Sequence, residues 1–160
     1  MQFVKVDVRK TKLMEKAVDQ AAAIRAAAAR LVEWVAVEFN KPRIAAETGL
    51  VFHRVAGSSD VRLVSPFGDG RLRLLLSAGD EGIEGRYLVE RKVCAVDDSA
   101  WWETVWALRI LAGGQLFMLG DDGMPPREIE APGSDGNAAE WARYIGLSIE
   151  YALAAGAQTA

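Results

Sequence analysis

The segment from Thr11 to Phe39 has the most regular apolar spacing in the chain. Its apolar positions alternate in steps of three and four: Met14, Ala17, Ala21, Ile24, Ala28, Leu31 and Val35. This spacing predicts one amphipathic helix, with Thr11 as N-cap and with Asn40 and Pro42 as the stop. A helix of about 28 residues is about 42 Å long, whereas a globule of this size is about 40 Å across. We therefore expect one end or flank of the helix to remain available for contacts with another molecule.

After this helix the apolar period changes from about 3.6 residues to two. Residues 41–49 are expected to add one or two helical turns that close at Gly49. Four strands are then predicted, separated by turns rich in Gly, Ser, Asp and Pro; they are VFHRVA, VRLVS, RLRLLLS and GRYLVERKVCAV.

Residues 101–119 hold three of the five tryptophans of the chain. One reading is a helix over residues 100–112, with Ser99 as N-cap and Gly113 at its end. The preferred reading is a strand that turns back through Gly113 and Gly114, because Trp, Thr and Val favour strands and paired glycines favour a tight hairpin turn.

Strict alternation along that strand separates two faces. The face expected to enter the core carries Trp102, Thr104, Trp106, Leu108, Ile110, Phe117 and Leu119. The opposite, mixed face carries Trp101, Glu103, Val105, Ala107, Arg109, Leu111, Leu116 and Met118. Because Glu103 and Arg109 do not suit a dry interior, we expect the mixed face to receive another molecule.

The last part of the chain is expected to contain a loop, one edge strand and a second helix. Prolines confine a strand at residues 127–130 to a sheet edge. Asn137 and Glu140 form a capping pair for an amphipathic helix over residues 138–155. The sequence therefore predicts one α+β domain over residues 1–160: an antiparallel meander of about five to seven strands, packed with the long N-terminal helix and the C-terminal helix.

Composition indicates a soluble globular protein. Of 160 residues, 51% are hydrophobic and 26% are charged, and Cys94 is the single cysteine, so no internal disulfide is possible. The sequence has no apolar run typical of a signal peptide and no stretch long enough for a membrane span. We therefore expect a cytoplasmic protein. The thirteen arginines against six lysines and the many alanines favour a bacterial or phage origin.

Charge is distributed unevenly along the chain, although the net charge is only −3. Residues 1–50 carry nine cations and six acids, residues 51–96 seven and six, and residues 97–160 three and ten. The acidic last part would suit a basic partner. No concentrated basic run is present, so nucleic-acid binding is not favoured.

Residues that could carry catalysis are few. His53 is the single histidine, and it lies between Phe52 and Arg54 on a predicted strand, where a packed or surface histidine is the preferred reading. Cys94 is expected to be a quiet thiol, since no neighbouring residue would lower its pKa. Neither residue predicts an active site.

Acidic pairs and arginines offer the remaining candidates for ligand binding. Asp80–Glu81, Asp97–Asp98 and Asp121–Asp122 lie in predicted turns, which is the preferred reading, although two such turns at one end of the sheet could hold Mg²⁺ or Ca²⁺. The segment GDEGIEG is too acidic for a phosphate loop. An arginine stripe on the open sheet face, preferred as a solvated surface, would comprise Arg54, Arg62, Arg71, Arg73 and Arg86.

These observations favour a non-enzymatic protein-interaction module without a cofactor, acting as an inhibitor, adaptor or dedicated chaperone and forming a homodimer. Self-association through the long helix is the preferred use of its free flank. The predicted partner interface comprises Trp34, Phe39, Trp101, Glu103, Val105, Arg109, Asp121 and Asp122. The alternative function is a small-ligand or metal-dependent binding protein or hydrolase with its site at the loop end of the sheet, using Asp121, Asp122, His53 or the arginines.

Overall fold

The computed structural model describes residues 3, 5–56, 58, 60–79, 82–112, 116–119, 127–130 and 138–157. For residues 116–119, 127–130, 138, 156 and 157 it describes only the backbone. Asp80, Glu81, Asp121, Asp122, Asn137 and the predicted turn at Gly113 and Gly114 thus lie outside the described residues.

The N-terminal helical segment is longer than predicted and is interrupted. Helix α1 spans Val8–Leu13, a 3₁₀ turn covers Met14–Lys16, and α2 continues over Ala17–Phe39. The predicted N-cap at Thr11 is wrong: Asp7 is the cap, and its side chain accepts a hydrogen bond from the backbone N–H of Lys10 at 2.9 Å. The predicted end is confirmed, with Asn40 as the C-cap.

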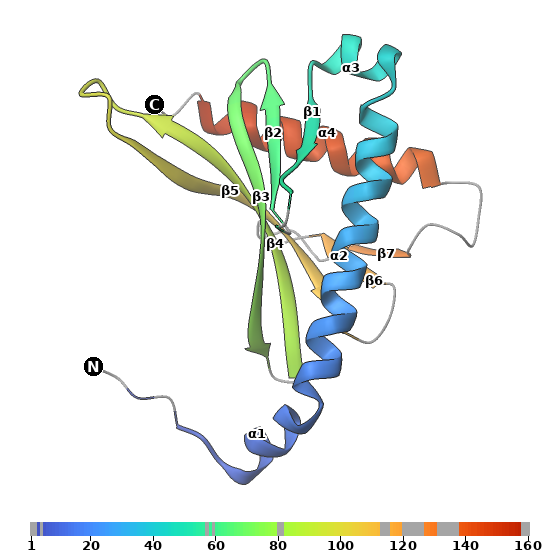
Figure 1. The fold of residues 1–160 in the computed structure, drawn as a ribbon, viewed down its shortest axis with the longest axis vertical. Coiled ribbons are helices and arrows are strands. Elements are labelled where there is room, and N and C mark those ends of the chain that lie inside the picture. The colour runs from blue at the N-terminus through green and yellow to red at the C-terminus, as the bar shows by residue number, and fades with distance from the viewer. Residues whose placement is uncertain are drawn as a thin grey trace.

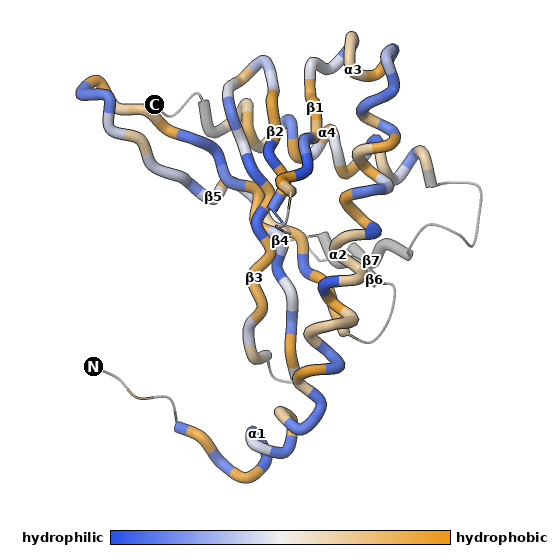
Figure 2. Tube along the Cα trace, viewed as in Figure 1, coloured by the Kyte–Doolittle hydropathy of each residue, from blue (hydrophilic) through white to orange (hydrophobic). Residues whose placement is uncertain are grey.

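Two features of this segment position the rest of the fold. Helix α3, Pro42–Thr48, follows α2 and closes at Gly49, whose φ of 69° lies in the left-handed region that glycine adopts easily. At the other end, no residue of α1 or of the 3₁₀ turn is buried. Figure 1 shows this first part extending beyond the sheet, as the length of the predicted helix implied. Figure 2 shows hydrophobic and hydrophilic residues alternating along α2.

In the part of the chain that the structure describes, seven antiparallel strands form one sheet in which order in space equals order in the chain. They are β1 (Val51–Arg54), β2 (Val61–Ser65), β3 (Gly68–Gly79), β4 (Gly82–Cys94), β5 (Ala100–Leu111), β6 (Leu116–Leu119) and β7 (Arg127–Glu130). The C-terminal helix α4 spans Ala138–Ala157. The predicted α+β meander is confirmed, and so is the strand in place of a helix at residues 100–112.

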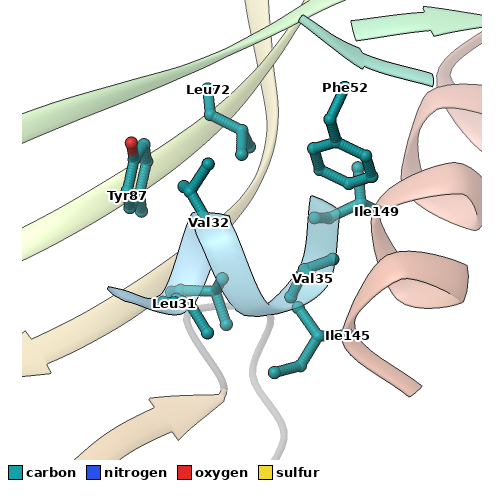
Figure 3. Close-up of a pocket in the computed structure, with 9 residues that line it drawn as sticks. Leu31, Val32, Val35, Phe52, Leu72, Tyr87, Ile145 and Ile149 are labelled. Carbon is teal, nitrogen blue, oxygen red and sulfur yellow. The ribbon is translucent and has the colours of Figure 1, made fainter. Parts of the chain in front are cut away.

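Both α2 and α4 pack on the same face of the sheet. The core lies between these two helices and the sheet. It combines Ile24, Leu31 and Val35 of α2, Ile145, Ile149 and Leu153 of α4, and Phe52, Leu63, Leu72, Tyr87, Val89, Leu108 and Ile110 of the sheet. Figure 3 shows these three sources of side chains converging. The remaining space is a cavity of about 10 Å³, which is too small for an organic ligand. Among the described residues, no helix covers the opposite face, which we call the open face.

Tyr87 gives the core an expected response to alkaline pH. The side chain is 2% exposed, and burial is the main cause that raises the pKa of its phenol to about 12. An unfolded tyrosine has a pKa of about 10. Above that pH the unfolded chain loses the proton while the folded protein keeps it, so unfolding becomes easier.

The free energy of unfolding should therefore fall by about 1.4 kcal/mol per pH unit between about pH 10 and pH 12 from this group alone. Tyr87→Phe should remove this part of the pH dependence. Urea titrations from about pH 9 to pH 12 would measure the free energy of unfolding of the wild type and of Tyr87→Phe. The other ionising groups are the same in both proteins, so the difference between the two slopes reports Tyr87. Equal slopes would contradict the prediction.

Candidate functional site

A β-bulge in β5 decides which way its side chains point. Val89 pairs with Trp106 and Glu90 pairs with Thr104, so Val105 is an extra residue without a partner in β4. An extra residue reverses the alternation of faces beyond it. The two faces predicted by strict alternation are therefore wrong for the residues before Val105, whereas Trp106, Leu108 and Ile110 face the core as predicted.

Trp101 and Trp102 still point to opposite faces, but not to those predicted. Trp101 pairs with Val93 and lies on the helix-bearing face together with Glu103. Trp102 pairs with Lys92 and lies on the open face, as does Arg109 farther along the strand. The exposed fractions are 50% for Trp101 and 36% for Trp102, so the placement of Trp102 in the core is wrong.

Both indoles are exposed because the β4–β5 hairpin extends past the helices. A Cβ added at Gly70 would contact Leu153 of α4, and Gly70 is the cross-strand partner of Arg91. Beyond that point lie residues 92–102, which we call the arm. Figure 1 shows the arm projecting to the upper left, away from α2.

The tip of the arm is a fixed and acidic turn. The backbone N–H of Ala95 donates to the carbonyl of Ser99 at 2.8 Å, and Asp98 adopts a left-handed φ of 63°. Hydrogen bonds from the hydroxyl and backbone N–H of Ser99 hold the pKa of Asp97 below its usual value. The prediction that this acidic pair shapes a turn is confirmed.

An ion-pair network anchors the arm on the open face. Glu90 is only 3% exposed and lies between Arg71 and Arg73, with oxygen–nitrogen distances of 2.5 and 2.8 Å. The Arg71 guanidinium also lies 4.2 Å from the ring centre of Trp102, a cation–π contact. Arg71 thus links the buried carboxylate to the indole and restricts the orientation of Trp102.

A second ion pair supports the arm from the other face. Arg91 is 6% exposed and donates from Nη2 to Glu103 at 2.8 Å, while 49% of the Glu103 side chain is exposed. Glu103, predicted as a partner contact, therefore presents a carboxylate beside Trp101 that is already fixed by a buried arginine.

The predicted arginine stripe forms in part. Arg62, Arg71, Arg73 and Arg86 share the open face, and Arg109 joins them. Arg54 does not: it lies on the helix-bearing face, 3.8 Å from Glu33 of α2. Asp69 pairs with Arg62 at 3.5 Å and Glu84 with Arg109 at 3.0 Å. Since carboxylates offset most of these cations, the stripe is a poor site for a free anion.

The remaining residues of the predicted interface do not form one exposed surface in the described part of the chain. Phe39 is completely buried and packs edge-on against Phe52 with ring centres 5.9 Å apart. Its prediction as a contact residue is wrong, because a partner could not reach it in the folded protein. Trp34 and Val105 are half-buried and pack against the core. Asp121 and Asp122 lie outside the described residues.

His53 and Cys94 do not meet. His53 is on β1 and Cys94 is at the end of β4, with β2 and β3 between these strands. Within the described part of the chain, no group of three or more His, Cys, Asp or Glu residues could hold a metal ion. Two hollows of about 420 Å³ are open and shallow; one lies between α2 and the end of the β3–β4 hairpin, the other beside Asn40.

Comparison of the chain with protein-family models, with curated proteins and with solved structures finds no match. Among the helices that the structure describes, none is long and apolar enough to cross a membrane. The arm is therefore the candidate site on physical grounds alone: a projecting hairpin with two part-exposed indoles, held at its base by the ion pairs of the buried Glu90 on one face and of the buried Arg91 on the other.

Proposed function

We propose that this protein is a non-enzymatic protein-interaction module, an inhibitor, adaptor or dedicated chaperone, that binds another protein through the arm. The observation that carries the proposal is the pair of tryptophans on opposite faces of a hairpin that extends beyond the helices. Tryptophan is one of the residue types enriched among the residues that dominate binding energy at interfaces. The Trp102 indole is already held by Arg71, so its binding would cost little side-chain entropy.

The partner is expected to present a basic apolar surface to the arm. Asp97, Asp98 and Glu103 are exposed on or beside the arm, and Lys92 is its one cation. Opposite charge on the partner would accelerate association and exclude acidic competitors. A groove lined by apolar side chains and rimmed by Lys or Arg would match Trp101 and this acidic rim.

Substitution of Trp101 tests the proposal. The partner is first isolated by affinity purification and identified by mass spectrometry, and its purified form is then titrated against each variant by calorimetry. Trp101→Ala should raise the dissociation constant at least about tenfold, as loss of an interface tryptophan does. It should leave the melting temperature nearly unchanged. Phe67→Ala is the matched control, because Phe67 is 47% exposed on a different turn.

Trp106→Ala provides the opposite pattern. Trp106 packs against the core from the helix-bearing face, so its truncation should cost about 2–3 kcal/mol of stability, a little less than for a fully buried tryptophan. Equal unfolding by Trp101→Ala and Trp106→Ala would contradict the assignment of Trp101 to a partner. Unchanged affinity with Trp101→Ala would reject the arm as the binding site.

The second part of the proposal is that the module acts as a homodimer. Light scattering at micromolar concentration should give twice the 17.4 kDa mass of one chain. A mass of one chain at every concentration would reject the homodimer. It would not affect the proposed role of the arm, which the Trp101→Ala experiment tests separately.

A further inference from the structure

Helix α4 is apolar on two sides, and only one of them enters the core. Ala142, Ile145, Ile149 and Leu153 are at most 1% exposed and form the inner side. On the outer side, Tyr144 is 43%, Leu147 is 50% and Tyr151 is 76% exposed. A helix with apolar residues around most of its circumference normally packs on both sides. The outer side of α4 is therefore an uncovered surface.

The outer side is also arranged symmetrically about its centre. Tyr144 and Tyr151 lie three residues before and four residues after Leu147, so all three occupy one stripe of the helix. When two copies of such a stripe cross antiparallel at Leu147, Tyr144 of each copy lies within one residue, about 1.5 Å, of the level of Tyr151 of the other. The ring of Tyr144 is already fixed by an edge contact with Trp141, with ring centres 5.8 Å apart.

Charges beside the stripe are complementary to themselves under the same pairing. Arg143 and Glu150 lie seven residues apart and hence on the same flank of the helix. In an antiparallel pair related by a two-fold axis, the same flank of each helix faces the other helix. Arg143 of one copy therefore lies within one residue, about 1.5 Å, of the level of Glu150 of the other. Two reciprocal ion pairs would then flank the apolar stripe.

Both charged groups have capacity for a new partner. Arg143 donates from Nε to Glu38 at 2.9 Å, and its side chain is still 56% exposed, with no partner for its terminal nitrogens in the described part of the chain. Glu150 is half-buried, and the residues that the structure describes give it no hydrogen bond or ion pair. Burial raises the pKa of the Glu150 carboxyl, and a facing arginine would stabilise its charged form.

We propose that a second copy of this chain covers the outer side of α4, forming a two-fold antiparallel α4–α4 contact centred on Leu147. This inference rests on the homodimer in the proposed function and replaces the long helix α2 as the surface for self-association. One face of a 20-residue helix, about 30 Å long and 10 Å wide, is smaller than a standard interface. The dimer should therefore dissociate in the micromolar range.

Leu147→Asp tests the contact by sedimentation equilibrium over micromolar concentrations. Two buried carboxylates at the two-fold axis should weaken the dimer at least about tenfold. Glu150→Arg should weaken it less, by placing like charges opposite Arg143. Val37→Asp is the control: Val37 is a 63% exposed apolar residue on α2, and its substitution should leave the dimer unchanged. Circular dichroism would confirm that each variant is folded.

Cross-linking locates the contact independently of stability. With the exposed Cys94 changed to serine, Leu147→Cys should oxidise to a covalent dimer, whereas Val37→Cys should remain a monomer on a denaturing gel. If the wild-type protein is a dimer and Leu147→Asp dimerises equally well, the α4 contact is overturned while the homodimer stands. The same holds if Val37→Cys forms the covalent dimer. A wild-type protein of one-chain mass at all concentrations would overturn both.

Discussion

Gly146→Ala is expected to destabilise the protein by about 2 kcal/mol, although alanine is the better helix former. In an exposed helix this substitution gains up to about 1 kcal/mol. At position 146 the added methyl group would overlap the ring of Phe39, which is fully buried and held against Phe52. Overpacking of such a site costs about 1–3 kcal/mol and here exceeds the gain in helix propensity.

Urea unfolding of Gly146→Ala, Phe39→Leu and the double variant would measure the effect as a cycle. The smaller leucine should make room for the methyl group, so the double variant should be more stable than the sum of the two single losses predicts. Ser148→Ala, at a partly exposed position on the same helix, should change stability by less than about 0.5 kcal/mol. A stabilising effect of Gly146→Ala would show that α2 and α4 do not cross at this glycine.

Glu90→Ala is expected to have a similarly large effect, about 2–3 kcal/mol. Removal of one member of a buried ion pair costs about 3–5 kcal/mol when the remaining charge stays buried. Here the side chains of Arg71 and Arg73 are 29% and 40% exposed, so water can hydrate part of the guanidinium groups and reduce the cost. Loss of the carboxylate would also release Arg71 from its position over Trp102.

Asp69→Ala is the matched control for Glu90→Ala. Asp69 pairs with Arg62 on the same open face at 3.5 Å, but the two side chains are 42% and 61% exposed. Such an exposed pair contributes at most about 1 kcal/mol. Chemical denaturation would give both losses, and tryptophan fluorescence would detect the change around Trp102. Equal losses in the two variants would contradict the role of Glu90 as a buried anchor.

Elements with a regular local pattern could be predicted from the sequence. The α2 spacing, the stop at Asn40, the left-handed Gly49 and the alternating strands depend on neighbours within a few residues. The start of the first helix could not be predicted as well, because Thr11 and Asp7 both suit a cap. The structure selects Asp7, and Thr11 instead donates its hydroxyl hydrogen to the carbonyl of Val8.

The orientation of the candidate site could not be predicted locally. The bulge at Val105 appears only in the pairing of β5 with β4, and it exchanges the faces of Trp101 and Trp102. The burial of Phe39 likewise depends on Gly146, more than 100 residues later. Periodicity therefore located the arm and its tryptophans, whereas contacts between distant segments determined which side chains it presents.

The order of the strands also bears on how this chain emerges from the ribosome. Each strand pairs only with its neighbours in the chain, so the meander can assemble hairpin by hairpin during synthesis. Its apolar face is nevertheless completed by Ile145, Ile149 and Leu153, which are translated after every strand. Until α4 has left the exit tunnel, α2 alone covers this face of the sheet in the nascent protein, and the apolar surface on which α4 later packs remains exposed to aggregation.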